Sequence, residues 1–337
     1  MQAIERRTLL KFFAALALTR ALPANAAAKA ARVILDVDTG RDDAWALIAA
    51  FNTHARLDSV IASYGNTSRN NAVQNTLDVL KLAAHQTRTA LPPVWVGERG
   101  PTIPNTENTA EIDRRANAGH NGLFNVPLPH AKQPAIIKGP DWEYAFSEHL
   151  KKLARTHGLV DYICCGPLTD LAEIIKATGP EITKYIGRVI AVGGSLEVGT
   201  KPDFNFMADP AAVQTVINTF GPRLTIVPYD DTRTLVMTGP EIEAIPANTP
   251  TRRFTRDVMA AHAASIPEHV SRLHDPTALL ALQHGLPTST IHVRVKTDLP
   301  DAGKLIPDTN GIEITRTHID AAQIPTIKSR VLGMILR

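Results

Sequence analysis

The stretch Asp36-Val37-Asp38-Thr39-Gly40-Arg41-Asp42-Asp43 decides the fold, because it joins an apolar run at residues 33–35 to a helix-like run at residues 44–51. This order predicts a buried strand that leads directly into a helix, as in parallel α/β sheets. Four carboxylates therefore gather at the carboxyl end of a strand, and this edge of an open α/β sheet is where ligands bind.

The acidic stretch suits a hard cation. Four acids this close repel one another unless a cation, a proton or an arginine compensates their charge. No cysteine or histidine lies among them, so Ca²⁺ or Mg²⁺, which take oxygen ligands, fits better than zinc or copper. One alternative needs no metal, because Asp42 and Asp43 could simply cap the helix.

Two other interpretations of this stretch fit less well. An EF-hand loop counted from Asp36 requires glutamate at its twelfth position, which is Leu47 here. Phosphatases of the haloacid dehalogenase type resemble Asp-x-Asp-x-Thr, with an aspartate as nucleophile. Asp36 would take that role in an aspartate-dependent phosphatase, but the fifth residue is Gly40.

Composition limits the choice of partners. The 337 residues could form one large α/β domain, and a hydrophobic content of 44% is ample for a buried core. The formal net charge is +3, and residues 1–26 carry all of this excess. The rest of the chain balances 32 basic against 32 acidic residues. This balance gives no reason to expect a nucleic-acid polymer as a partner, because phosphate backbones require a basic excess, and it leaves a small-molecule substrate open.

The first 26 residues are typical of an export signal rather than of a folded domain. Arg6-Arg7 precede the apolar run 12–18, and Ala24-Asn25-Ala26 is a small-residue cleavage site. The segment resembles a bacterial twin-arginine signal, which implies a periplasmic or secreted mature protein. An amphipathic helix of a cytoplasmic protein is the alternative, but it explains neither the arginine pair nor the cleavage site. No apolar run is long enough for a membrane span.

Strand-like and helix-like segments alternate along the rest of the chain, which predicts a parallel sheet with crossover helices. We expect further strands at 57–63, 93–96, 160–164, 189–192 and 224–227, and a helix at 70–84. Residues 97–140 are punctuated by proline and glycine and lack periodicity, so we expect a loop that covers the site. No linker divides the chain, and residues 27–337 are therefore expected to form a single domain.

Polar clusters recur after the predicted strands. They are Gly65-Asn66, Cys165 to Asp170, Gly193 to Ser195, Asp203 to Asn205 and, opening a later helix, His274-Asp275-Pro276. Each has an ordinary explanation, such as a turn at Asn66, a helix cap at His274 or a solvated acid at Asp203. Their shared position with the four aspartates favours one composite site at the carboxyl edge of the sheet.

These residues together resemble the inosine–uridine preferring nucleoside hydrolase family. Its signature, Asp-x-Asp-x-Gly-x-Asp-Asp, matches residues 36–43 at every fixed position. Further matches, among them Gly166-Pro167-Leu168-Thr169 and His274-Asp275-Pro276, run along nearly the whole mature chain. The resemblance implies a Rossmann-like nucleoside hydrolase fold, an α/β fold with an open, mostly parallel (mixed) sheet flanked by helices. It also implies hydrolysis of a ribonucleoside to ribose and a free nucleobase, and it suggests a homo-oligomer, either a dimer or a tetramer.

The resemblance further implies one tightly held Ca²⁺. Its ligands would be the side chains of Asp38, Asp43 and Asp275 and the main-chain carbonyl of Cys165, a ligand that places no demand on the side chain. The remaining positions would go to the attacking water and to two ribose hydroxyls. The residues that would bind the sugar are Asp42, Asn66, Asn205 and, toward its 5′ end, Asp203.

The chemistry agrees with this arrangement. Cleavage of a glycosidic carbon–nitrogen bond passes through a transition state with oxocarbenium character, and carboxylates complement its positive charge. Calcium polarises water less than zinc does, so a separate base is needed, and Asp38 is the candidate. His274 is the only histidine within a matched motif and is the candidate general acid. Orienting Asp275 or capping the helix is an equally open role for His274.

The chain departs from the family at several places, among them residues 118–123, residues 203–205 and the stretch between Gly194 and Asp203, which has Gly199-Thr200 where the family usually has Gly-Asn. Many members have a segment that resembles His-Gly-x-x-Gly-Leu, whereas this chain has Ala118-Gly119-His120-Asn121-Gly122-Leu123. Ala118 therefore replaces the histidine of this loop, and alanine cannot assist the leaving group. The family usually has Glu-Phe-Asn where this chain has Asp203-Phe204-Asn205, so the carboxylate is one methylene shorter. We therefore expect a different or weaker requirement for a 5′-hydroxyl. A calcium-containing protein that binds nucleoside or ribose with weakened turnover is the alternative function.

Overall fold

The computed structural model describes residues 31–53, 55–103, 118–131, 136–137, 139–197 and 199–337. The expected export signal at residues 1–26 therefore lies outside the described residues. Segments 104–117, 132–135 and residue 138 of the expected cover loop also lie outside them.

The fold is built on a ten-stranded sheet with the order β11-β10-β12-β7-β6-β5-β1-β2-β3-β4. Neighbouring strands from β12 to β4 run parallel. Most of the parallel strands end in near-continuous apolar runs, as expected where helices cover both faces of a sheet. They are β1 (Arg32–Val37), β2 (Arg56–Ala62), β3 (Val94–Val96), β4 (Ile136–Ile137), β5 (Val160–Cys164), β6 (Ile186–Val192) and β7 (Leu224–Val227).

The sheet is mixed because the strands near the end of the chain include antiparallel pairs. β10 (Thr288–Val295) runs antiparallel to both β11 (Leu305–Pro307) and β12 (Ile312–Thr317), and β12 joins the parallel part at β7. A separate two-stranded sheet pairs β8 (Val236–Thr238) with β9 (Val270–Arg272). Most residues of β10 are exposed, so the apolar runs that revealed the buried strands were missing there.

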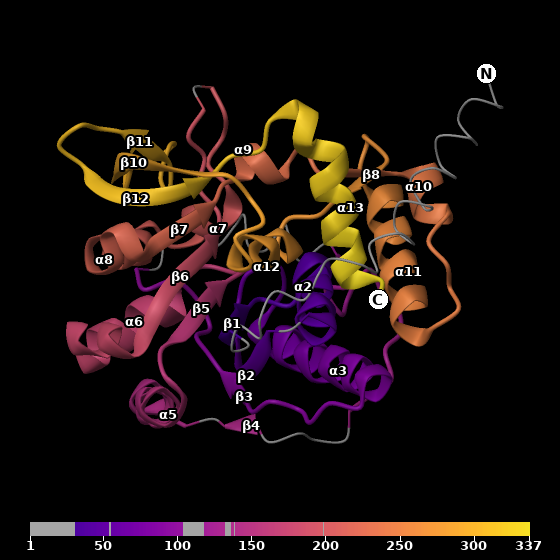
Figure 1. Ribbon diagram of the computed structural model, residues 1–337, viewed down its shortest axis with the longest axis horizontal. Helices are drawn as coiled ribbons and strands as arrows, with labels where there is room; N and C mark the ends of the chain where they lie inside the picture. Colours follow the sequence, from indigo (N-terminus) through magenta and orange to yellow (C-terminus); the bar gives the residue numbers. More distant parts are fainter. Residues whose placement is uncertain (1–30, 54, 104–117, 132–135, 138, 198) are drawn as a thin grey trace, which may run out of the picture.

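Helices cover both faces of the sheet (Figure 1). In β1, Val33, Leu35 and Val37 enter one core cluster and Ile34 enters the other, as the two-residue repeat of a strand requires. Helices that contribute buried residues to the first cluster, and so cover that face of the sheet, are α2 (Arg41–Asn52), α3 (Arg69–Thr87), α11 (Pro250–Ser265), α12 (Pro276–Leu282) and α13 (Ile324–Ile335). The second includes α5 (Trp142–His157), α6 (Thr169–Thr178) and α8 (Pro210–Phe220). Shorter helices are α7 (Phe204–Ala208), α9 (Tyr229–Thr232), α10 (Gly239–Glu243), η1 (Pro180–Tyr185), η2 (Gly221–Arg223) and η3 (Ala321–Gln323).

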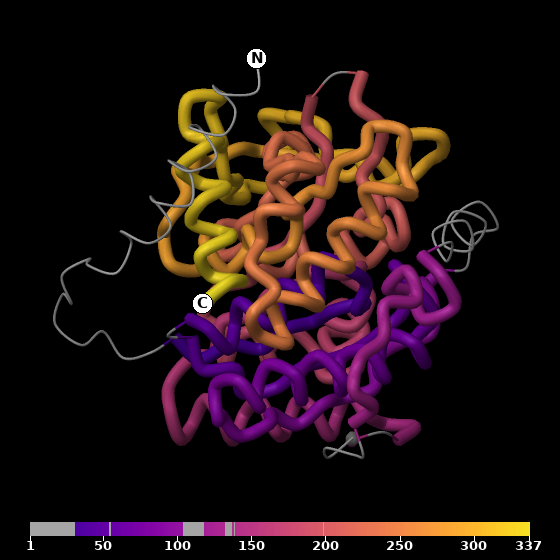
Figure 2. Tube along the Cα trace, turned by 90° about the vertical axis from the view of Figure 1, so that its right-hand side faces the viewer, coloured from indigo at the N-terminus to yellow at the C-terminus, as the bar shows by residue number. Residues whose placement is uncertain are grey.

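The predicted fold class is confirmed. The strands expected at 160–164 and 224–227 coincide with β5 and β7, and the expected helix at 70–84 lies within α3. Helices α11 and α12 from the second half of the chain pack against α2 from the first, and Figure 2 shows the two halves meeting along the molecule. Among the described helices, none is long and apolar enough to cross a membrane.

Candidate active site

Asp43 fixes the turn between β1 and α2. Its Oδ1 accepts a hydrogen bond from the Asp38 N–H at 3.2 Å, and its Oδ2 accepts one from the Gly40 N–H at 3.0 Å. The carboxylate therefore satisfies backbone donors beside a helix start, where helical partners are missing. Asp43 is fully buried, so these bonds hold its side chain at the end of the strand.

Asp38 lies against Asn66, which follows β2. The Asn66 N–H donates to Asp38 Oδ2 at 2.6 Å, and Asn66 Nδ2 donates to Asp38 Oδ1 at 3.0 Å and to Asp43 Oδ2 at 3.2 Å. The preceding residue must be glycine, because a Cβ on Gly65 would lie 1.9 Å from Asp38 Oδ2. The Gly65-Asn66 pair is thus more than an ordinary turn, since it binds two carboxylates of the acidic stretch.

Three carboxylates converge at this edge of the sheet. Oxygen atoms of Asp42, Asp43 and Asp275 lie within 4.8 Å of one another, and all three residues are buried. Among the described residues, Asp42 Oδ1 and Asp275 Oδ2 have no hydrogen-bond partner. Buried oxygens without a donor are costly, and a cation shared by the three carboxylates would satisfy them. Because every side-chain donor is an oxygen, these residues fit a hard metal ion such as Ca²⁺ or Mg²⁺.

The cluster only partly coincides with the ligand set expected from the sequence. It contains Asp43 and Asp275 as expected, and it adds Asp42, for which we expected a sugar contact. Asp38 is outside it, with both oxygens bound by Asn66. The main-chain oxygen of Cys165 accepts a hydrogen bond from Asn205 Nδ2 at 2.6 Å. The ligand roles of Asp38 and Cys165 stay predictions.

Without a metal ion, burial and then mutual repulsion disfavour the charged forms of most carboxylates in this region. Burial and the neighbouring carboxylates raise the pKa of Asp38 and of Asp275 well above the usual value, and burial and Asp42 also raise the pKa of Asp43. Burial acts on Asp42 in the same direction, but the cations Arg41 and His274 outweigh it and lower the pKa of Asp42. The site is therefore built to receive positive charge.

Asp36 lies away from this cluster, on the other face of β1. Its Oδ2 accepts a hydrogen bond from the Tyr162 hydroxyl at 2.8 Å, and the side chain is fully buried. Burial and the neighbouring Asp170 carboxylate raise the pKa of Asp36 well above the usual value. A fully buried carboxyl group that does not line the cavity over the site cannot reach a substrate as a nucleophile, so the structure argues against the phosphatase alternative.

A cavity of about 770 Å³ opens over the carboxylate cluster. This volume lies in the range of pockets that enclose small molecules, which is about 300–1,000 Å³. The residues of the expected site that line it are Asp42, Asn66, Cys165, Asp203, Asn205, His274 and Asp275. The structure thus brings seven of the nine sequence-predicted site residues to one cavity, and the other two, Asp38 and Asp43, are fully buried.

Two of the expected sugar-binding side chains also hold the backbone. Asp203 caps α7, with Oδ2 accepting from the Gly194 N–H at 2.5 Å and Oδ1 from the Phe206 N–H at 3.3 Å. Asn205 Nδ2 donates to the main-chain oxygens of Cys165 and Val192. Asp203 therefore has a structural role that the sequence did not reveal, while the sugar-binding roles of both residues stay predictions.

His274 contacts the one-turn helix α9 from two sides. Its Nδ1 lies 2.8 Å from Thr232 Oγ1, and its ring stacks on Tyr229 with centroids 5.8 Å apart. Thr232 Oγ1 also donates to the Pro228 oxygen at 3.4 Å, so it is placed to accept from the His274 Nδ1–H. Nothing in the sequence linked Thr232 or Tyr229 to the site, because the contacts join segments about 42 residues apart.

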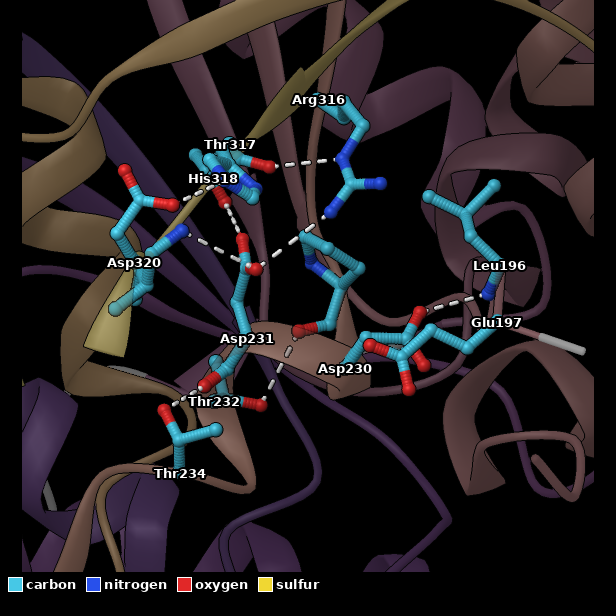
Figure 3. A network of polar contacts seen from close by, with 12 residues as sticks. Leu196, Glu197, Asp230, Asp231, Thr232, Thr234, Arg316, Thr317, His318 and Asp320 are labelled. Atoms are coloured by element: carbon cyan, nitrogen blue, oxygen red, sulfur yellow. Dashed lines mark hydrogen bonds and ion pairs between the residues drawn. The ribbon is translucent and has the colours of Figure 1, made fainter.

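Two aspartates hold α9 in place (Figure 3). Asp231 accepts from Thr317 Oγ1 at 2.9 Å and from the Ile319 N–H at 3.3 Å, which ties α9 to the end of β12. Asp230 Oδ2 accepts from the Leu196 N–H at 2.7 Å, which ties it to the loop after β6. The orientation of His274 therefore depends on contacts made by the far end of the chain.

A second cavity of about 240 Å³ lies beside the first, and both are lined by Arg41 and Asn66. Ala118 and Gly122 form part of its wall, so the described part of the expected cover loop does lie beside the site. Phe124 and His262 form another part, with ring centroids 5.6 Å apart. Burial and the nearby Arg41 lower the pKa of His262 to about 3, so this side chain is neutral at ordinary pH.

The family model of the inosine-uridine preferring nucleoside hydrolases matches residues 33–326. The chain belongs to this family. As a nucleoside hydrolase it is an enzyme that hydrolyses N-glycosyl bonds, and its acidic stretch, its two cavities and the His274-Asp275 pair all lie within the matched residues.

Curated nucleoside hydrolases resemble the chain over most of its length. It is 26% identical to probable uridine nucleosidase 1 of Oryza sativa subsp. japonica, covering 75% of this chain and 76% of the relative. It is 27% identical to the pyrimidine-specific ribonucleoside hydrolase RihA of Enterobacter sp. (strain 638), covering 73% and 77%. A purine-preferring ribonucleoside hydrolase from Gardnerella vaginalis has a similar structure, with a TM-score of 0.73 at 24% identity over 90% of this chain and 99% of that chain. This structural likeness supports the fold.

Proposed function

We propose that the protein is an exported, calcium-dependent ribonucleoside hydrolase that releases ribose and a free nucleobase. The observation that carries this proposal is the convergence of Asp42, Asp43 and Asp275 on the floor of a cavity that His274 also lines. The named relatives act on ribonucleosides, which supports the substrate class. Export rests on the twin-arginine-like segment alone, and a dimer or tetramer remains our expectation for the assembly.

The carboxylates would serve the ribose side of the reaction. Positive charge grows on the ribose as the carbon–nitrogen bond breaks, and buried carboxylates held by fixed donors stabilise it without rearranging. Asp38 would accept the proton of the attacking water, because its carboxylate is held in a fixed orientation by two hydrogen bonds from Asn66. A Ca²⁺ held by Asp43, Asp275 and their neighbours would supply charge compensation and sites for the water and the ribose hydroxyls.

His274 would serve the leaving base. Thr232 is placed to accept from Nδ1–H, so a proton on Nε2 would make the ring an imidazolium that can donate to the departing base. Stacking on Tyr229 holds the ring plane. The role is thus supported by an orienting contact, in the way that a second residue commonly orients a catalytic histidine.

The decisive experiment is a reducing-sugar assay with inosine and uridine. Release of ribose supports the proposal, and tight nucleoside binding without release supports the binding-protein alternative. Release of phosphate from a nucleotide, with Mg²⁺ preferred over Ca²⁺, would instead revive the phosphatase.

Thr232→Val is expected to lower kcat on inosine by about 10–100-fold, because it removes a hydrogen bond to a charged ring while keeping the side-chain shape. The same variant should keep most of its activity on 4-nitrophenyl β-D-ribofuranoside, whose leaving group needs no proton. A pH–rate profile should lose the limb assigned to His274. Equal losses on both substrates would show that Thr232 only supports the fold.

The shortened carboxylate at Asp203 should relax recognition at the 5′ end of the sugar. The Asp203 carboxylate already binds the Gly194 and Phe206 N–H groups. We therefore expect kcat/KM to be less than about tenfold lower for 5′-deoxyinosine than for inosine. Loss of a hydrogen bond to a charged group that has no other partner would lower it by more. A ribonucleoside hydrolase with Glu-Phe-Asn at this position, assayed in parallel, provides the control. The same loss in both enzymes would contradict the expectation.

A further inference from the structure

Arg41 occupies a variable position of the acidic motif and lies between the two cavities. It lines both of them, together with Asn66. Its guanidinium makes a long ion pair with Asp42, with Nη2 at 3.7 Å from Oδ2. The turn that brings Asp42 and Asp43 into the carboxylate cluster therefore also places a permanent cation beside it.

The guanidinium has unused hydrogen-bonding capacity. Its Nε is buried and has no partner among the described residues. A buried donor without an acceptor is costly, and the long contact with Asp42 does not involve this atom. The buried Nε therefore lacks the acceptor that a bound ligand could supply.

Among the described residues that line the smaller cavity, Arg41 is the only one that carries a charge at ordinary pH. His262 is the other titratable residue there, and it stays neutral. Ala118 contributes no donor. If a group next to the smaller cavity becomes negatively charged, Arg41 is the cation among the cavity's lining residues that can neutralise it.

We propose that Arg41 is a further catalytic residue, whose guanidinium neutralises the negative charge that the departing nucleobase acquires. This rests on the proposed function, because it concerns the leaving group of that reaction. A guanidinium offers donors only, so it favours bases that present carbonyl oxygens or bare ring nitrogens, such as uracil and hypoxanthine.

The reaction balances with Arg41 in this role. The electron pair of the bond between the ribose C1′ and the base nitrogen goes to the base, whose ring spreads the charge onto its acceptors. The water oxygen bonds to C1′, and its proton passes to Asp38. The base takes up one proton from the His274 imidazolium, and the proton on Asp38 returns through solvent to His274, so that nucleoside and water become ribose and neutral base. Arg41 stays charged throughout and only compensates the base anion.

The test uses Arg41→Ala with uridine and 5-fluorouridine, whose bases have nearly the same shape but leave with different ease. We expect kcat to fall by about 10–100-fold on uridine, because a hydrogen bond to a charged group is lost in the transition state. The loss should be smaller on 5-fluorouridine, because fluorine already stabilises the leaving anion. Guanidinium ion at millimolar concentration should partly restore the activity of the variant, whereas urea, which has a similar shape and no charge, should not.

Melting curves of the variant and of Arg41→Lys, which keeps the charge but not the planar fork, control for folding. If Arg41→Ala is unfolded, Arg41→Met and Arg41→Lys carry the same comparison of the two substrates. Equal losses on uridine and 5-fluorouridine with no rescue, or activity within twofold of the parent, would overturn the role of Arg41 and leave the proposed function intact. A parent protein inactive on every nucleoside would overturn both.

Discussion

Asp275→Asn is expected to lower kcat/KM on uridine by at least about 10²–10³-fold, the loss typical of one group that stabilises transition-state charge. Asp275 shares the cluster with Asp42 and Asp43, and its Oδ2 has no hydrogen-bond partner among the described residues. The substitution keeps the shape of the side chain and removes the charge, so the measured loss reports the electrostatic contribution. Steady-state kinetics with saturating Ca²⁺ would measure it.

The same variant should not be destabilised when metal is absent. Burial, then Asp42 and Asp43, raise the pKa of Asp275, so the folded metal-free protein bears a cost for this carboxylate at neutral pH. Metal-free Asp275→Asn should therefore melt at the same temperature as the parent or higher. Asp161→Asn is the matched control, because Asp161 forms an ion pair with Arg188 away from the cavity. Near-normal activity of Asp275→Asn, or a loss of the same size in the control, would contradict this prediction.

Removal of the metal is expected to abolish turnover and to lower the melting temperature. A ligand at 1,000 times its Kd stabilises the folded state by about 4 kcal/mol, which for a chain of this size shifts Tm by on the order of 5–10 °C. Dialysis against chelator, followed by calorimetry and a ribose assay, would measure both effects. Ca²⁺ should restore both, and Mg²⁺ should restore them less well, because it accepts crowded carboxylate sites reluctantly.

The metal effect should depend on pH. The raised pKa values of Asp38, Asp43 and Asp275 mean that the metal-free folded state keeps protons that the unfolded state has released. Stability of the metal-free protein therefore falls as pH rises above the ordinary aspartate pKa of about 4, until the folded groups have also ionised. Metal displaces these protons, so its stabilising effect should be larger at pH 8 than at pH 5. If chelator changed neither the activity nor the Tm at either pH, the proposed mechanism would have no role for a metal.

The sequence was most informative where local pattern and burial coincide. Residues 33–37 and 160–164 form largely apolar, largely buried strands, and the residues that follow them contribute to the site. The motif carboxylates are positioned by the turn itself, since Asp43 binds the N–H groups of Asp38 and Gly40. A short-range arrangement of this kind can be predicted from one chain.

The remainder depends on contacts between distant segments. Strand β10 is mostly exposed on the sheet edge, so its sequence lacks the signal of a buried strand. The partners of His274 come from α9, and the second cavity combines Arg41 with Phe124 and His262. Asp203 looked like a sugar ligand because its neighbours match the family, yet its carboxylate also caps α7. Only the packing of helices and loops determines these pairings.

The attachment of α9 to β12 links His274 to a region of the chain that lines neither cavity. Thr317 and Ile319 bind Asp231, whose neighbour Thr232 binds His274. Drift in the residues around Thr317 and Ile319 can thus alter the orientation of His274 without changing a single motif residue. Natural variants with diverged tails would be expected to differ in the acidity at which they work best, even when their signature stretches are identical.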